Sequence, residues 1–416
     1  MNIQSGTYYW PDTFPDPPAY PALHENIACD VLIVGGGSSG AQCAYYLADQ
    51  PLKVVVVEKG KIGSGSTSTN TALIQYSGEK MFTNLIHSFG EDYTRRHLDL
   101  LHRAIDEIEA AASRTRLDFE FCRRDTLYCA SCTEDVAPLH EEYELLRRLG
   151  CDLEFWSQEQ IEAHYPFSRE AAIYSRKDAE LNPFKFTHAL LDYAAEHGVR
   201  IYEHTEVNGH YYEDGHRLVV MTTKDGYTIT ARQVIFAAGY EGIEIQKDKQ
   251  VSFVSTYTVT TSPITDLSSW YHRTLIWETA RPYIYMRTTA DNRIIIGGLD
   301  ENTDYPEVRD RKLVHKTDKL MEELTKRFPD LGQDVRAEYA LASFYGGTAD
   351  GMPIIGRYEK YPNCYFLFAF GDNGTVYSQA LSRLIAKEVA GEHDPDLQLY
   401  LSERPLLQQP AGLPVS

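Results

Sequence analysis

A glycine-rich segment near the N-terminus restricts the fold of this chain more than any other feature. Residues 35–40, Gly-Gly-Gly-Ser-Ser-Gly, stand between an apolar stretch, Asp30 to Val34, and a stretch with helical character, Ser38 to Ala48. A second apolar run, Lys53 to Glu58, follows directly. This order of strand, G-x-G-x-x-G turn, helix and strand is typical of a βαβ unit that binds a dinucleotide.

The residue types in this unit suit a pyrophosphate group. Gly35 permits a tight turn, Gly37 lets the backbone approach a phosphate, and Gly40 lets the helix pack on the strand. The helix that begins at Ser38 presents free N–H groups and a partial positive charge to the phosphates. Glu58 ends the second strand, where a carboxylate accepts hydrogen bonds from ribose hydroxyls. A glycine-rich turn without a ligand is the alternative, but the complete unit favours a dinucleotide.

Three later segments favour FAD over a nicotinamide cofactor. Residues 62–72 are dense in glycine and hydroxyl side chains, which can bind phosphate and the flavin ring, although a flexible loop is the alternative. Residues 234–239 read as a strand that ends in small residues, which permits another close backbone approach. Residues 371–374 form a second glycine-rich helix entry, after the segment 350–356. The flavin benefits from a second helix N-terminus because its pyrimidine ring gains negative charge on reduction.

These segments supply the predicted cofactor-binding residues. They are Gly35, Gly37, Ser38, Ser39, Gly40, Glu58, Lys59, Gly65, Ser66, Thr67, Ser68, Thr69, Asn70, Ala238, Gly239, Gly371, Asp372, Asn373, Gly374 and Thr375.

Composition restricts the partners and the compartment. The chain carries 60 acidic against 40 basic residues, a net charge of -20, so neither nucleic acid nor a membrane face is expected as a partner. Its apolar runs are too short to span a bilayer, and the first basic residue is Lys53, so no secretory signal is expected. Seven cysteines suit reduced thiols better than a disulfide framework, and the histidines show no metal-binding spacing. We therefore expect a cytoplasmic protein without a metal site.

The rest of the chain alternates helical and strand patterns. Apolar spacing predicts helices over residues 91–112, 134–149, 313–328 and 375–390. Asn182-Pro183 should begin a further helix that Gly198 ends, and Ser157 with Gln160 predicts a capping box. Period-two patterns predict strands over residues 199–204, 217–222, 227–231, 233–237, 283–287 and 293–297. The aromatic and proline-rich residues 1–27 predict an ordered arm on the body, with disorder as the alternative.

Together these ordered segments resemble the D-amino acid oxidase-like (DAO) family of FAD enzymes, which includes glycine oxidase, sarcosine oxidase and the γ-glutamylputrescine oxidases. The resemblance runs from about Asp30 to Ala390. It implies an α/β fold with a Rossmann-like FAD-binding domain, assembled from discontinuous segments, and an inserted substrate domain of β-sheet plus helices that caps the flavin. It also implies that Val207 lies beside the adenine.

The implied domains can be assigned to residue ranges. After the arm at 1–27, we expect the FAD-binding domain in 28–80, 166–245 and 336–416, and the substrate domain in 81–165 and 246–335.

Departures from the family bear on the substrate. The amino acid oxidases of the family often carry a carboxylate-binding arginine where this chain has Tyr345. Sarcosine oxidases link FAD through a cysteine where this chain has Ser343, and their basic residues after the Gly-Ser segment fall here on Ser68, Ala72 and Gln75. These differences imply non-covalent FAD and argue against a simple α-amino acid as substrate.

One cation, Arg287, remains a candidate for the substrate site. Strand alternation puts Tyr283, Tyr285 and Arg287 on one face. That face either roofs the substrate pocket, or the arginine lies on a solvated edge while the tyrosines pack in a core. We take Tyr285, Arg287, Tyr345 and Gln75 as the candidate catalytic residues.

The predicted activity is oxidation of a C–N bond in a small amine or N-substituted amino acid, by hydride transfer to flavin N5. Oxygen or another acceptor would then reoxidise the flavin. An FAD dehydrogenase of a hydroxy acid or polyol, or a flavoprotein without turnover, is the alternative.

Overall fold

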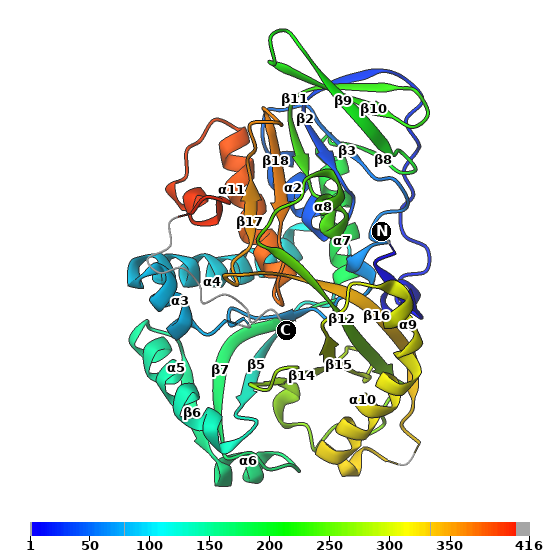
Figure 1. The fold of residues 1–416 in the computed structure, drawn as a ribbon. Coiled ribbons are helices and arrows are strands. Elements are labelled where there is room, and N and C mark those ends of the chain that lie inside the picture. Colours follow the sequence, from blue (N-terminus) through cyan, green and yellow to red (C-terminus); the bar gives the residue numbers. More distant parts are fainter. Residues whose placement is uncertain (1, 79, 333, 405–416) are drawn as a thin grey trace.

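The protein is described by a computed structural model that covers residues 2–78, 80–332 and 334–404. Two β-sheets, each with its own helices, lie one above the other in Figure 1. The upper sheet contains the glycine-rich turn. The lower sheet collects segments from along the whole chain, from the N-terminal arm to residue 348.

The upper sheet has a parallel core in the order β18-β11-β2-β3-β8, with β17 antiparallel at one edge and the β9–β10 hairpin attached to β11. Val54–Val57 is buried along its whole length, as expected for a central parallel strand covered on both faces. The strand bounds are β2 (Ile27–Val34), β3 (Val54–Val57), β8 (Arg200–Tyr202), β9 (Val207–Glu213), β10 (Leu218–Thr223), β11 (Thr228–Phe236), β17 (Ile354–Gly356) and β18 (Cys364–Phe368).

Three helices pack together beside this sheet: α2 (Ser38–Ala48), α7 (Pro183–Glu196) and α11 (Gly374–Val389). The predicted helix over 38–48 is confirmed residue for residue. The start of α7 is also confirmed, because the Asn182 side chain accepts a hydrogen bond from the Lys185 N–H. The strands expected over 227–231 and 233–237 form one continuous strand, β11.

The lower sheet runs in the order β1-β16-β12-β15-β14-β13-β5-β7-β4, with β6 paired to β7. Its pairs are antiparallel except β13–β5. The bounds are β1 (Gln4–Gly6), β4 (Leu73–Ile74), β5 (Cys122–Cys129), β6 (Leu153–Ser157), β7 (Ala171–Glu180), β12 (Val251–Thr261), β13 (Leu275–Glu278), β14 (Ile284–Thr288), β15 (Ile294–Glu301) and β16 (Ala337–Thr348).

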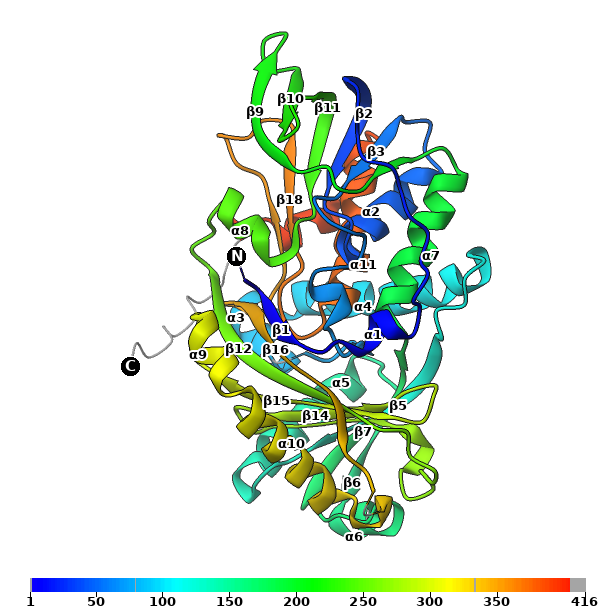
Figure 2. The same ribbon diagram turned by 90° about the vertical axis from the view of Figure 1, so that its right-hand side faces the viewer.

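Helices cover the flanks of the lower sheet and the junction between the two sheets (Figures 1 and 2). α4 packs against α11 at the junction, whereas α10 packs on β12 and β15. The capping box predicted at Ser157 is present at the start of α6. The bounds are α3 (Phe82–Phe89), α4 (Glu91–Arg114), α5 (Val136–Arg148), α6 (Gln158–His164), α9 (Pro306–Arg311) and α10 (Leu313–Arg327).

The α/β fold class is confirmed, but strand pairing differs from the expected division into domains. β7 and β16 fall in ranges assigned to the FAD-binding domain, 166–245 and 336–416, and β4 falls in 28–80; all three pair in the lower sheet. Sheet membership depends on partners distant in sequence, which local patterns do not reveal. Residues 405–416 of the last range lie outside the described residues.

The N-terminal arm is ordered along the described part of 1–27. β1 pairs with β16, and α1 (Tyr9–Asp12) buries Tyr9 and Trp10. The Trp10 indole N–H donates to the Asn70 carbonyl at 2.7 Å. The arm therefore lies against the loop at 62–72, which the disordered alternative would not allow. Within the described residues, no helix combines the length and apolar character needed to cross a membrane.

Candidate active site

A cavity of about 630 Å³ lies where the two sheets meet. Its volume falls in the range of small-molecule and cofactor sites. From the upper sheet it is lined by the ends of β2, β3 and β11 and by the first turns of α2 and α11. From the lower sheet it is lined by β12, β14, β15 and β16, and the loop at 64–73 crosses between the two.

The three motif glycines serve different purposes in the structure. Gly35 has φ of 115°, and a Cβ there would lie 2.4 Å from the Ala237 carbonyl oxygen. At Gly40 a Cβ would lie 1.9 Å from the Gly35 carbonyl oxygen, so this glycine packs the helix on the turn and does not line the cavity. At Gly37 the nearest described atom would be Thr67 Oγ1, at 3.2 Å, and Gly37 lines the cavity. A pyrophosphate could approach the backbone at Gly37.

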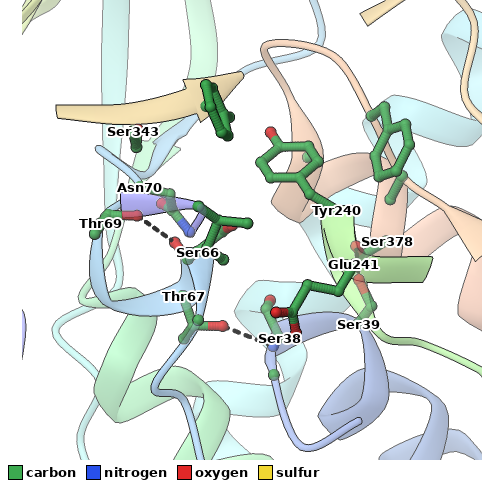
Figure 3. Close-up of a pocket in the computed structure, with 18 of the residues that line it drawn as sticks. Ser38, Ser39, Ser66, Thr67, Thr69, Asn70, Tyr240, Glu241, Ser343 and Ser378 are labelled. Carbon is green, nitrogen blue, oxygen red and sulfur yellow. Dashed lines mark hydrogen bonds between the residues drawn. The ribbon is translucent and has the colours of Figure 1, made fainter. Parts of the chain in front are cut away.

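Side-chain hydroxyls join the loop at 64–73 to α2, and α2 to α11 (Figure 3). The Ser38 N–H at the start of α2 donates to Thr67 Oγ1 at 2.9 Å. The hydroxyls of Ser39 and Ser378 lie 2.7 Å apart and join α2 to α11. These contacts bring two helix N-termini and one hydroxyl-rich loop to the same cavity, a concentration of N–H and O–H donors that suits phosphate and the flavin ring.

Glu58 lines the cavity, and its own turn holds it in place. Oε2 accepts from the Gly36 N–H and Oε1 from the Gly60 N–H, each at 2.8 Å. Each carboxylate oxygen has a second lone pair, so both can still accept from a ligand hydroxyl. Lys59 forms an ion pair with Glu241 at 2.6 Å.

Most of the predicted cofactor-binding residues line this one cavity; the exceptions are Gly40 and Ser68. The Ser68 hydroxyl donates to the Gly65 carbonyl at 2.8 Å, and the side chain is buried inside its own turn. The residues that line it are Gly35, Gly37, Ser38, Ser39, Glu58, Lys59, Gly65, Ser66, Thr67, Thr69, Asn70, Val207, Ala238, Gly239, Gly371, Asp372, Asn373, Gly374 and Thr375.

Three of the four candidate catalytic residues, Gln75, Tyr285 and Tyr345, also line the cavity. Burial raises the pKa of Tyr285 to about 12, with a further contribution from the Asp300 charge, so its hydroxyl keeps its proton at neutral pH. Gly297 makes room for this ring, since a Cβ there would lie 2.4 Å from the Tyr285 hydroxyl oxygen.

Arg287 requires a correction, because it does not line the cavity. Its guanidinium is 2% exposed and donates to the carbonyls of Thr71, at 2.7 Å, and Leu181, at 2.8 Å. It lies 3.5 Å from Glu180 and 5.1 Å from the centre of the Trp10 ring. A buried cation needs such partners to offset its desolvation. The arm and the loop carbonyl therefore seal Arg287 off, although it shares the strand face of Tyr285.

Sequence reasoning missed several lining residues. Asn2, Ile3 and Gln4 reach the cavity because β1 pairs with β16, while Trp277 and Asp300 come from strands of the lower sheet. No local motif marks these positions. The alternation of aromatic residues at 283–285 was the sequence feature that indicated the lower-sheet side of the cavity.

A dinucleotide-type turn and a second helix N-terminus, both at one cavity between two sheets, are typical of FAD-dependent oxidoreductases. A family described as DAO, FAD dependent oxidoreductase, matches residues 30–388, and the chain belongs to this family. It is therefore an FAD enzyme, as the sequence predicted. The predicted α/β fold also agrees with the solved structures that this chain resembles.

Similar proteins extend over most of the chain. Gamma-glutamylputrescine oxidoreductase of Escherichia coli (strain K12) is 27% identical over 382 residues, covering 90% of this chain and 86% of that protein. YhfW of Bacillus subtilis (strain 168), whose name describes a Rieske 2Fe-2S iron-sulfur protein, is 29% identical over 47% of this chain, and the match spans only 38% of that protein. The structure of L-proline dehydrogenase from P. horikoshii has a TM-score of 0.75 at 21% identity, covering 92% of this chain and 98% of that one.

Proposed function

We propose that this protein oxidises a carbon–nitrogen bond in a small cationic amine, with FAD held non-covalently in the cavity. FAD would supply the hydride acceptor for this chemistry. The observation that carries the proposal is the charge of the cavity wall.

Carboxylates dominate that wall. Among the described residues that line it, Lys59 is the one cationic side chain, and it is paired with Glu241. A cavity lined by one sign of charge concentrates ligands of the opposite sign. The lining carboxylates are Glu58, Glu206, Glu241, Glu244, Asp300 and Asp372.

The other residues on the lower-sheet side of the cavity also suit an ammonium group. Trp277, Tyr283 and Tyr285 line it from β13 and β14 and the turn between them, with 5.4 Å between the two tyrosine rings. Aromatic faces attract cations, most strongly when the site is desolvated. Asp300 lies on the same wall, so a carboxylate and aromatic rings could share one ammonium.

An anionic substrate group finds no comparable partner among the described residues of the cavity. Tyr345 occupies the position at which related oxidases carry an arginine, and Arg287 is sealed behind the loop at 69–72. The buried position of Arg287 therefore argues against an N-substituted amino acid whose carboxylate reaches that residue, and it favours a plain amine as substrate. The E. coli relative is named for a putrescine derivative, which agrees with an amine as substrate.

Non-covalent attachment has its own support. Among the described residues that line the cavity there is no cysteine and no histidine, and Ser343 is one of the lining residues. The chain's own contribution would be to orient the amine against the flavin and to exclude water. In that role the Tyr285 hydroxyl, which keeps its proton, can donate a hydrogen bond but supplies no base at neutral pH.

A charge-removal experiment tests this proposal. We expect Asp300→Asn to raise the amine concentration for half-maximal anaerobic flavin reduction by about 10-fold, the loss of roughly one charge-assisted contact. Glu206→Gln is the matched control, since Glu206 precedes β9 of the upper sheet, is paired with Lys224 and does not belong to the lower-sheet wall that carries Asp300, so this concentration should change much less. Equal effects of both variants, or efficient reduction by a hydroxy acid or polyol, would contradict an amine site. Reoxidation with oxygen and with an artificial acceptor, compared in parallel, identifies the acceptor class.

A further inference from the structure

A fully buried carboxylate lies behind the cavity wall. Asp178, near the end of β7, has an exposed fraction of 0%. Beside it the β5–β7 pairing shifts register between Arg124 and Thr126, and Lys177 has φ of 74°. Such bulges re-aim side chains. Burying a carboxylate is costly unless hydrogen bonds compensate for the lost hydration.

Two donors satisfy this carboxylate, and one of them leads to the cavity. The Tyr76 N–H donates to Asp178 Oδ1 at 3.2 Å, and the Thr126 hydroxyl donates to Oδ2 at 2.6 Å. The same Thr126 oxygen accepts from Nε2 of Gln75 at 3.3 Å. Gln75 lines the cavity. Three side chains thus connect a buried charge to the site.

The proton count gives this connection a direction. A carboxylate only accepts hydrogen bonds, so Thr126 must donate its single proton to Asp178. Its lone pairs are then left for Gln75, and only the amide nitrogen of Gln75 can donate to them. With Nε2 held by Thr126, the carbonyl oxygen Oε1 is the amide atom left to accept a hydrogen bond from a ligand in the cavity that Gln75 lines.

We propose that Asp178 is a positioning residue for the substrate amine: through Thr126 it orients the Gln75 amide so that Oε1 accepts a substrate N–H. This inference rests on the proposed amine oxidation and adds a specific contact to it. Asp300 and the aromatic rings attract a cation without regard to its N–H directions. Gln75 would select for a cation that has an N–H to donate.

Protonation of Asp178 should reverse the direction of the hydrogen bonds that join Asp178, Thr126 and Gln75. Burial, together with the Asp125 charge, raises the pKa of this carboxyl to about 7, although the hydrogen bonds from Thr126 and Tyr76 and the Arg123 charge act to lower it. Tyr76 and Cys151 also interact with it, and burial raises the pKa of both, so they stay neutral at pH 7. Arg124, opposite Asp178 in β5, pairs instead with Glu180 at 2.8 Å.

A protonated Asp178 can donate to Thr126, whose proton then goes to Gln75 Oε1. That turns the amide NH2 group towards the cavity, where it opposes an ammonium. Ammonium binding should therefore weaken as pH falls below about 7, with a dependence on one proton.

The test uses tert-butylammonium as a probe of the FAD-loaded protein. This ion has no hydrogen on the carbon next to nitrogen, so it cannot be oxidised, and alkylammonium groups stay charged near pH 7. Binding is measured through the change in flavin absorbance. In Asp178→Asn, Oδ1 still accepts from the Tyr76 N–H, so the new NH2 group faces Thr126 and the connection is reversed. We expect the Kd to rise about 10-fold or more.

Matched variants separate this effect from general destabilisation. Glu142 is also buried and accepts from the N–H groups of Phe82 and Thr83, so Glu142→Gln should leave the Kd unchanged. Thr126→Val cuts the connection, and adding Asp178→Asn to it should then have no further effect. Thr126→Ser keeps the hydroxyl and should bind as the unmodified protein does.

The outcomes are distinct. A Kd that Asp178→Asn leaves unchanged, or an effect that persists in the Thr126→Val background, would overturn the inference while the proposed function stands. If no amine reduces the flavin and the probe does not bind, the proposed function fails, and this inference fails with it. Should Asp178→Asn not fold, the unmodified protein decides the question, because a Kd constant between pH 8 and pH 6 would refute the reversal.

Discussion

Gly37 offers a way to separate FAD binding from folding. A Cβ at this position would have one described neighbour within 4 Å, Thr67 Oγ1 at 3.2 Å, and it would project into the cavity. The backbone at Gly37 is extended, with φ of -83°, so any residue can adopt it. Gly37→Val should therefore fold but leave too little room for the cofactor.

The magnitude follows from overpacking. Inserting methyl groups into a filled site typically costs about 1–3 kcal/mol, which weakens FAD binding by roughly 5- to 150-fold. Gly37→Ala should lie at the lower end of that range. Gly40→Ala is the contrasting variant, because its Cβ would lie 1.9 Å from a backbone oxygen and the helix itself would have to move.

The assay compares apo and FAD-loaded protein for each variant. We expect the apo Tm of Gly37→Val to match that of the unmodified protein, while its Kd for FAD, measured by flavin fluorescence, rises. Gly40→Ala should lower the apo Tm. Full flavin retention by Gly37→Val after extensive dialysis would refute the placement of the dinucleotide at this turn.

Three further outcomes follow from the structure. Arg287→Met should lower the free energy of unfolding by about 3–5 kcal/mol in denaturant titrations, the cost of breaking a buried ion pair; loss of activity without loss of stability would contradict its structural role. Burial lowers the pKa of His97 to about 3, so between pH 6.5 and 3 the unfolded state binds a proton that the folded state does not. The free energy of unfolding should therefore decrease by about 1.4 kcal/mol for each unit by which the pH is lowered through this range. His97→Gln should remove that slope, and an unchanged slope would argue against a neutral buried His97. Acid precipitation should leave the flavin in the supernatant, whereas yellow colour in the pellet would indicate covalent attachment.

Local chemistry made much of the upper sheet predictable. The turn at 35–40 and the cap at Asn182 depend on residues adjacent in sequence, and the structure places both where the pattern predicted. The same logic located most of the cofactor cavity, because its glycine and hydroxyl residues belong to contiguous segments.

Long-range pairing limited the rest. β12 and β16 pair over most of their length, yet neither strand was predicted from the sequence, although Tyr257 and Val259 alternate with threonines in β12. Arg287 illustrates the same limit in the site. Alternation predicted its strand face correctly, but the Trp10 ring that covers it comes from the N-terminal arm, 277 residues away in the sequence. The Asp178 connection could not be predicted for the same reason, since it joins β7 and β5 to the residue that follows β4.

Anaerobic titration of the FAD-loaded protein tests the central claim most directly. Amines, their carboxylated analogues, and hydroxy acids or polyols are added in turn, and the flavin absorbance is followed. A small cationic amine should bleach the flavin at lower concentration than its carboxylated analogue, since the cavity wall is rich in carboxylates. Bleaching by a hydroxy acid or polyol alone, or by none of these compounds, would contradict an amine oxidoreductase.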